Sequence, residues 1–172
     1  MALSLYDVSI PVITRGLRQL RNYLGKGAEH ATREGYDPAV LLQTRLYPDM
    51  FPLTKQVQVA SDITKNGCAR LAGLEPPKWE DKESTMEELI ARAERTMQFL
   101  SGLTAEQINP SQTREIVVPM RNRSMHFATG WEYLSQFVLP NFYFHCTTTY
   151  AILRHCGVKI GKSDFIGELG AP

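Results

Sequence analysis

Residues 131–156, WEYLSQFVLPNFYFHCTTTYAILRHC, carry the pattern that decides the fold. Apolar side chains recur there at steps of three and four residues, which is the spacing of one face of an α-helix. Thr129 and Glu132 form a capping box at the start of this pattern, and Gly157 follows it as a stop signal. Pro140 interrupts the pattern, so the sequence predicts either a kink at this residue or the start of a second helix there.

His145 is the strongest candidate for a functional residue. Asn141, Thr148 and Thr149 lie three or four residues away and share its helix face. A short polar stripe on an otherwise apolar helix is how a helix bundle builds an internal site. An imidazole in that position can bind a metal or act as a general base, and it can equally be a core histidine that is hydrogen-bonded across the bundle.

Length and composition indicate one globular domain over residues 1–172, with 43% hydrophobic and 22% charged residues. The net charge of +1 gives no basic field, so nucleic acid is not an expected partner. No apolar run is long enough to span a membrane, and the N-terminus lacks the basic region of a signal peptide. Three cysteines without CxxC spacing argue against a disulfide or zinc framework and favour a reducing, cytoplasmic location.

Three more long helical patterns precede the quoted stretch, and each is bounded by capping or stop residues. They are Leu5 to Leu24, stopped by Gly25 and Gly27; a helix with Asp49 as its N-cap that runs to about Leu71; and a helix with a capping box at Ser84 and Glu87 that Gly102 ends. In the third, the charges of EELIARAER are expected on the solvated side, with Glu88 and Arg92 paired at i,i+4.

Two β-like runs, Glu115–Met120 and Ser124–Phe127, precede the last long helix. They predict a short hairpin that Pro119 confines to an edge. Four long helical patterns with a hairpin before the last one predict an all-α fold, namely a four-helix bundle.

Polar residues near the second long helix are the expected partners of His145. Asp49 is the second catalytic candidate, because a carboxylate near an imidazole can orient it or complete a metal site. Capping or a structural hydrogen bond is the competing interpretation for each polar residue. The candidate ligand-binding residues are Gln56, Asn141, Tyr47 and Thr148. We predict that His145, Asn141, Asp49 and Gln56 line one cavity.

Three stretches resemble a family known as a domain of unknown function, DUF1993, in the DinB- and YfiT-like superfamily of four-helix bundles. They are LYDVSIPVITRGL, LYPDMFPLTKQVQVASD and LPNFYFHCTTTYAILRHCGVKIGKSDFIG. The superfamily holds a divalent metal with three histidines, and the resemblance places those positions near Gln56, at Asn141 and at His145. Two amides thus stand where imidazoles are usual, so the resemblance implies only weak binding of zinc or nickel at His145.

Three functions stay open at this point. The first is a small-molecule-binding or catalytic bundle with a polar pocket around His145, because the superfamily includes metal-dependent hydrolases and thiol transferases. The second is a non-catalytic interaction or stress-associated module. The third is a metal-free isomerase or cyclase in which Asp49 and His145 shuttle protons. Bundles of this superfamily often pair, so a homodimer is also expected, with exposed aromatic residues of the hairpin as a candidate contact.

Overall fold

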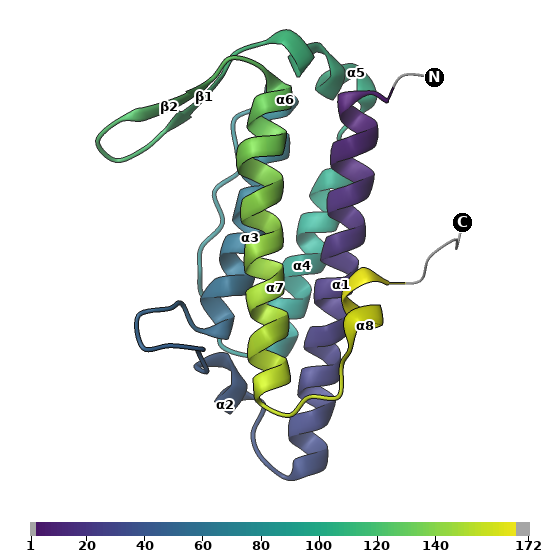
Figure 1. Ribbon diagram of the computed structural model, residues 1–172, viewed down its shortest axis with the longest axis vertical. Coiled ribbons are helices and arrows are strands. Elements are labelled where there is room, and N and C mark those ends of the chain that lie inside the picture. Colours follow the sequence, from purple (N-terminus) through teal and green to yellow (C-terminus); the bar gives the residue numbers. More distant parts are fainter. Residues whose placement is uncertain (1–2, 168–172) are drawn as a thin grey trace.

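The structure is a computed structural model that describes residues 3–167, so the ends of the predicted domain, residues 1–2 and 168–172, lie outside it. Four long helices lie side by side along one axis, and a two-stranded hairpin projects from one end (Figure 1). The long helices are α1 (Leu5–Glu34), α3 (Leu53–Leu71), α4 (Met86–Ser101) and α7 (Leu139–His155). The prediction of a mostly helical fold with a hairpin before the last long helix is confirmed.

The core fills the space between these helices, where α1 packs on α4 and α3 packs on α7. Its side chains come from all four helices and include Leu17, Leu20, Val57, Leu89, Phe142 and Ile152. In the part of the chain that the structure describes, no helix is long and apolar enough to cross a membrane.

α1 continues past the predicted stop at Leu24 and ends at Glu34. Gly27 is buried, and a Cβ atom on it would lie 3.0 Å from Leu153 Cδ2. Gly27 therefore allows α1 and α7 to approach closely inside a continuous helix, and the prediction that it stops the helix was wrong. The stop is Gly35, whose φ of 81° is the left-handed conformation typical of a helix C-terminus.

α3 begins at Leu53, directly after Pro52, so the prediction that Asp49 is its N-cap was wrong. Asp49 is exposed in the loop between α2 (Ala39–Leu42) and α3. The Leu53 N–H donates to the carbonyl of Thr44 at 2.9 Å, which closes this loop across the start of the helix. Pro52 fits at a helix start, because the N–H that proline lacks has no partner inside the helix there.

The capping box of α4 lies one residue later than predicted. Thr85 Oγ1 accepts from the Glu88 N–H at 3.2 Å, and the Glu88 carboxylate accepts from the Thr85 N–H at 3.2 Å. The Ser84 N–H also donates to that carboxylate, at 2.6 Å. Gly102 ends the helix, as predicted.

The hairpin pairs β1 (Ile116–Pro119) with β2 (Ser124–Phe127) in antiparallel register, as predicted. Before it lie α5 (Ala105–Ile108) and a 3-10 helix (Asn109–Thr113). The aromatic ring of the hairpin, Phe127, is only half exposed and packs on two rings of the following helical segment. The large hydrophobic side chains that the hairpin exposes, Val117 and Met120, are not aromatic, and its role as a dimer contact stays a prediction.

The last helical stretch changes its hydrogen-bond pattern before Pro140. It consists of α6 (Gly130–Glu132), a π-helical segment (Tyr133–Val138) and α7. Proline cannot donate to the carbonyl four residues before it, and the wider π turns fall at that place. The predicted interruption at Pro140 therefore takes the form of a π segment joined to a second α-helix. A short helix, α8 (Lys162–Ile166), follows α7.

Candidate functional site

α3 and α7 bring together two of the residues that the sequence singled out. His145 Nδ1 lies 2.7 Å from Gln56 Oε1. The Gln56 side-chain amide donates in turn to the carbonyl of Phe51, at 3.0 Å. Gln56 is 1% exposed and His145 is 8% exposed, so both lie inside the protein. His145 and Gln56 form one buried polar pair across the interface between the two helices.

This contact fixes the nitrogen of His145 that carries the proton. Because the Gln56 N–H group bonds the Phe51 carbonyl, its oxygen faces the imidazole, and an amide oxygen can only accept. Nδ1 must therefore donate. Burial lowers the pKa of His145 below its ordinary value and favours the neutral ring, in which Nε2 carries a lone pair.

Nε2 of His145 is the free atom of the pair. It has no hydrogen-bond partner among residues 3–167. It is also not among the buried unpartnered atoms of that range, which are Ser61 Oγ and Arg92 Nε. Nε2 is therefore not completely buried.

Asn141 and Thr148 share the helix face of His145 but bond to their own helix. The Asn141 amide donates to the carbonyl of Phe137 at 2.7 Å, and the Thr148 hydroxyl donates to the carbonyl of Phe144 at 2.8 Å. Such bonds satisfy the side chain locally. The structure thus gives neither residue a direct bond to His145, and their ligand-binding roles stay predictions.

Asp49 and Tyr47 lie in the loop of residues 43–52, which joins α2 to α3. Asp49 is exposed, and no hydrogen bond or ion pair joins it to another residue of the described range. Tyr47 is 65% exposed. The catalytic role of Asp49 and the ligand-binding role of Tyr47 stay predictions. The same loop supplies the Phe51 carbonyl, a backbone group that no side-chain pattern could have identified.

The possible metal ligands around His145 do not form a complete metal site. The Gln56 oxygen already accepts from Nδ1, on the side of the ring away from Nε2. Within residues 3–167, no group of three histidine, cysteine or carboxylate side chains could hold a metal ion. A zinc or nickel site generally has three or more protein ligands. Of the residues at the three positions of the family pattern, His145 alone carries an imidazole, and its free ring nitrogen is Nε2.

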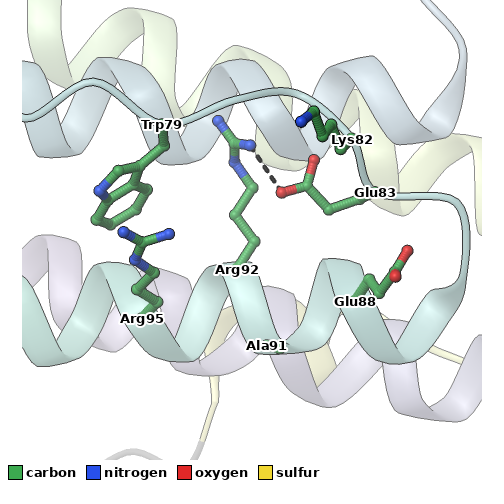
Figure 2. Close-up of a pocket in the computed structure, with 7 residues that line it drawn as sticks. All are labelled: Trp79, Lys82, Glu83, Glu88, Ala91, Arg92 and Arg95. Carbon is green, nitrogen blue, oxygen red and sulfur yellow. Dashed lines mark hydrogen bonds and ion pairs between the residues drawn. The ribbon is translucent and has the colours of Figure 1, made fainter.

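A second buried polar cluster, around Arg92, was missed. Its side chain is 2% exposed and forms ion pairs with Asp62 and Asp81 at 2.9 Å each and with Glu83 at 2.8 Å. The prediction that Arg92 pairs with Glu88 on a solvated face was wrong, because the loop of residues 72–85 folds over α4 and supplies closer carboxylates. Figure 2 shows Arg92 reaching from α4 toward this loop, beside Glu83.

Trp79 lies beside this cluster and contacts two cationic side chains. Lys65 Nζ lies 4.5 Å and the Arg95 guanidinium carbon 4.2 Å from the centre of its indole ring. A hollow of about 270 Å³ lies beside the ring, between the loop and α4 (Figure 2). Within it, the donors of Arg92 are bound to carboxylates and a carbonyl, except Nε. The cluster holds the loop in place and leaves no accessible polar atom of Arg92 for a ligand.

Comparisons with known proteins agree with the resemblance seen in the sequence. The family model described as "Domain of unknown function (DUF1993)" matches residues 5–166. The chain is also similar to the crystal structure of a DinB family member protein from Shewanella denitrificans, with 35% identity and a TM-score of 0.88 over 98% of this chain and 94% of that one. The comparison with curated proteins finds no match. The chain belongs to the DUF1993 family and is a DinB-like protein.

Proposed function

We propose that this protein binds a small molecule at His145, whose Nε2 atom accepts a proton or a hydrogen bond from the ligand. One observation carries the proposal: Gln56 holds the Nδ1–H of a buried imidazole and leaves the lone pair of Nε2 free. A partner on one ring nitrogen orients the ring and fixes which nitrogen carries the proton. The lowered pKa keeps that lone pair available at neutral pH.

The ligand must offer an N–H or O–H group, because a neutral Nε2 can only accept. We infer that the four long helices form a four-helix bundle of the DinB type, and that the ligand enters between α3 and α7 beside the loop of residues 43–52. Bundles build their sites from facing helices in this way. The free thiols of Cys68, Cys146 and Cys156 support a reducing compartment.

The geometry favours binding at one acceptor atom over a proton shuttle, as in a metal-free isomerase or cyclase, and over a metal-dependent reaction. A proton shuttle between Asp49 and His145 needs both groups within hydrogen-bond reach of the substrate, and no contact supports that arrangement. A metal-dependent reaction needs ligands that the side chains near His145 do not supply.

A fragment screen by thermal shift tests the proposal on the full chain. His145→Phe removes both ring nitrogens and keeps a planar ring of similar size. His155→Phe is the matched control, because His155 is an exposed histidine in the last turn of the same helix. Fragments that carry an N–H or O–H group should raise the melting temperature of the natural protein and of His155→Phe, and lose that effect in His145→Phe.

A fragment that stabilises His145→Phe as strongly as the natural protein binds elsewhere and does not support the proposal. If every stabilising fragment behaves in that way, His145 is a core histidine and the proposal is wrong. Circular dichroism of the variants shows whether the fold is intact before the screen is interpreted.

A further inference from the structure

Arg95 of α4 differs from Arg92, about one turn before it, in what its guanidinium contacts. Both terminal nitrogens of Arg92 are bound to carboxylates. Arg95 is exposed, and its guanidinium carbon lies 4.2 Å from the centre of the Trp79 indole ring. No hydrogen bond or ion pair joins Arg95 to another residue of the range 3–167. Its guanidinium therefore keeps its N–H donors for a group from outside the chain.

Trp79 holds the Arg95 guanidinium in place, because an aromatic face attracts a cation. The loop of residues 72–85, which carries Trp79, is itself fixed to α4 by the ion pairs of Arg92. Lys65 of α3 is buried and contacts the same ring at 4.5 Å. A side chain that is already ordered loses less freedom when it binds a ligand. Arg95 is thus positioned before any ligand arrives.

The hollow of about 270 Å³ beside Trp79 also adjoins Arg95 (Figure 2). Its α4 lining comes from one face of the helix, because Glu88, Ala91, Arg92 and Arg95 lie three or four residues apart. Ala91 is the smallest of these side chains, and it leaves space that a larger side chain would fill. The volume equals that of about nine water molecules, at ~30 Å³ each. A small organic molecule fits this space.

The two ends of the hollow differ in charge. Trp79 and Arg95 lie together at one end, and Glu83 and Glu88 lie at the other (Figure 2). Both carboxylates accept hydrogen bonds from groups of the chain. The cation at that end, Lys82, is paired with a carboxylate of its own loop. An anionic group is therefore favoured beside Arg95 and disfavoured at the far end.

A carboxylate fits Arg95 because its two oxygens can accept from two parallel N–H groups of one guanidinium. A second anionic group on the same ligand would lie near Glu83 and Glu88 and would be repelled. The indole of Trp79 and the methyl group of Ala91 suit an uncharged, apolar body. We propose that the hollow between α4 and the loop of residues 72–85 binds a small monocarboxylate, whose carboxylate Arg95 holds.

This carboxylate site is separate from the site proposed at His145. It lies between α4 and the loop of residues 72–85, whereas His145 lies between α3 and α7. The ligand of His145 must donate a hydrogen bond, whereas the ligand of Arg95 must accept one. Either proposal can therefore fail without the other.

Benzoate is a suitable probe, because it is a planar monocarboxylate with an apolar body. The chain has two tryptophans, so Trp131→Phe leaves Trp79 as the fluorescent reporter. At constant ionic strength, we expect a saturable change in its fluorescence with a Kd on the order of 1 mM. The NMR signal of the Arg95 Nε–H group, identified by its loss in Arg95→Ala, should shift in the same titration. Benzamide has the same shape without the charge and should bind about 10-fold more weakly or worse.

Two variants in the Trp131→Phe background test the site in different ways. Arg95→Ala removes the guanidinium, whereas Ala91→Leu fills the hollow and keeps every charge. Each should weaken benzoate binding by about 10-fold or more. Both positions are exposed, so the fold should be kept, and circular dichroism checks this. Arg18→Ala is the matched control, because Arg18 is an exposed arginine of α1 that does not line the hollow, and it should bind benzoate unchanged.

Several results would overturn the carboxylate site. Benzoate might change neither the Trp79 fluorescence nor the Arg95 Nε–H signal, or benzamide might bind as tightly as benzoate. Undiminished binding by Arg95→Ala or by Ala91→Leu would exclude the hollow. An equal loss in Arg18→Ala would show a general attraction to surface arginines. A loss in His145→Phe would assign benzoate to the other site.

Discussion

Two buried polar clusters rest on α3, and they differ in what they leave free. The pair of His145 and Gln56 is neutral, and one nitrogen of the ring keeps an unused lone pair. The cluster around Arg92 is charged, and both terminal nitrogens of its guanidinium are bound to carboxylates. Burial of a charge is costly unless it is paired, whereas a neutral ring needs fewer partners. The neutral pair is therefore the one that can offer an atom to a ligand.

The difference also separates two structural tasks. Arg92 joins Asp62 of α3 to Asp81 and Glu83 of the loop of residues 72–85, so it fixes a connection. Lys55 extends this network with an ion pair to Asp81 at 2.6 Å. The imidazole of His145 is held by a single side chain. We expect the charged network to contribute mainly to stability and the neutral pair mainly to binding.

Removal of Arg92 should have the largest effect. Arg92→Ala leaves three carboxylates without their shared partner, and breaking a buried ion pair typically lowers the free energy of unfolding by about 3–5 kcal/mol. Urea denaturation measures this difference. Arg95→Ala is the control, because Arg95 is exposed and its contact with Trp79 should contribute about 0.5–1 kcal/mol. If Arg92→Ala lowers the free energy of unfolding by less than about 1 kcal/mol, Arg92 contributes no more than a surface ion pair does. That result would contradict the stabilising role of the charged cluster.

Loss of the Gln56 amide should be less costly. Gln56→Leu leaves the Nδ1–H of His145 without an acceptor, which should lower the free energy of unfolding by about 1–3 kcal/mol. Asn141→Leu, on the same face of α7, removes only a bond to its own helix and should cost less. If Gln56→Leu is as stable as the natural protein, the bond to His145 does not hold the ring.

The two clusters should respond to acid in different ranges of pH. Burial raises the pKa values of Asp81 and Glu83, but the bonds from Lys55, Arg92 and Gln58 outweigh it, so both pKa values lie below their ordinary 3.8 and 4.5. These carboxylates therefore stabilise the fold above about pH 4.5, and this stability is lost as the pH falls through their folded pKa values.

The neutral pair should act at higher pH. Because the pKa of folded His145 lies below its ordinary 6.5, the unfolded chain takes up that proton first as the pH falls. Stability should therefore decrease slightly just below pH 6.5, and His145→Phe should remove that step. Arg92→Ala should weaken the second, more acidic step. Urea denaturation across this pH range measures both steps. If His145→Phe changed the acidic step, or Arg92→Ala the step just below pH 6.5, the two clusters would not respond separately.

The smallest expected effect is a shift in the pKa of the His145 ring, without a large change in stability. Gln56→Glu places a carboxylate beside Nδ1, which favours the protonated ring and should raise the pKa of His145. An NMR titration of the ring protons measures it. A pKa that stays below its ordinary value in Gln56→Glu would show that residue 56 does not face the imidazole.

The pairing of His145 with Gln56 was predictable, because both residues lie on apolar helix faces where a polar side chain needs a partner. Leu89 likewise lies on the apolar face of its helix, at three- and four-residue spacing, and it is fully buried. Periodicity thus gives which face of a helix points inward. It does not give which loops cover that face.

The errors in the prediction have this cause. Arg92 looks solvated in its own helix, and only the folding of residues 72–85 over α4 buries it. Gly27 looks like a stop signal in the sequence. Its reason for being glycine is a close contact with Leu153, which belongs to a helix far along the chain and is not visible in the local sequence. Asp49 looks like an N-cap, but the helix begins at Leu53, directly after Pro52. For Arg92 and Gly27, a contact distant in sequence outweighs the local preference.

The position of the proton on His145 at neutral pH decides whether Nε2 can accept from a ligand. Nitrogen-15 NMR distinguishes a ring nitrogen that carries a proton from one that carries a lone pair, and His145→Phe identifies the signals among the four histidines. We predict a proton on Nδ1 and a lone pair on Nε2. A proton on Nε2, or a doubly protonated ring at pH 7, would contradict the account, because the atom assigned to the ligand would then have nothing to accept with.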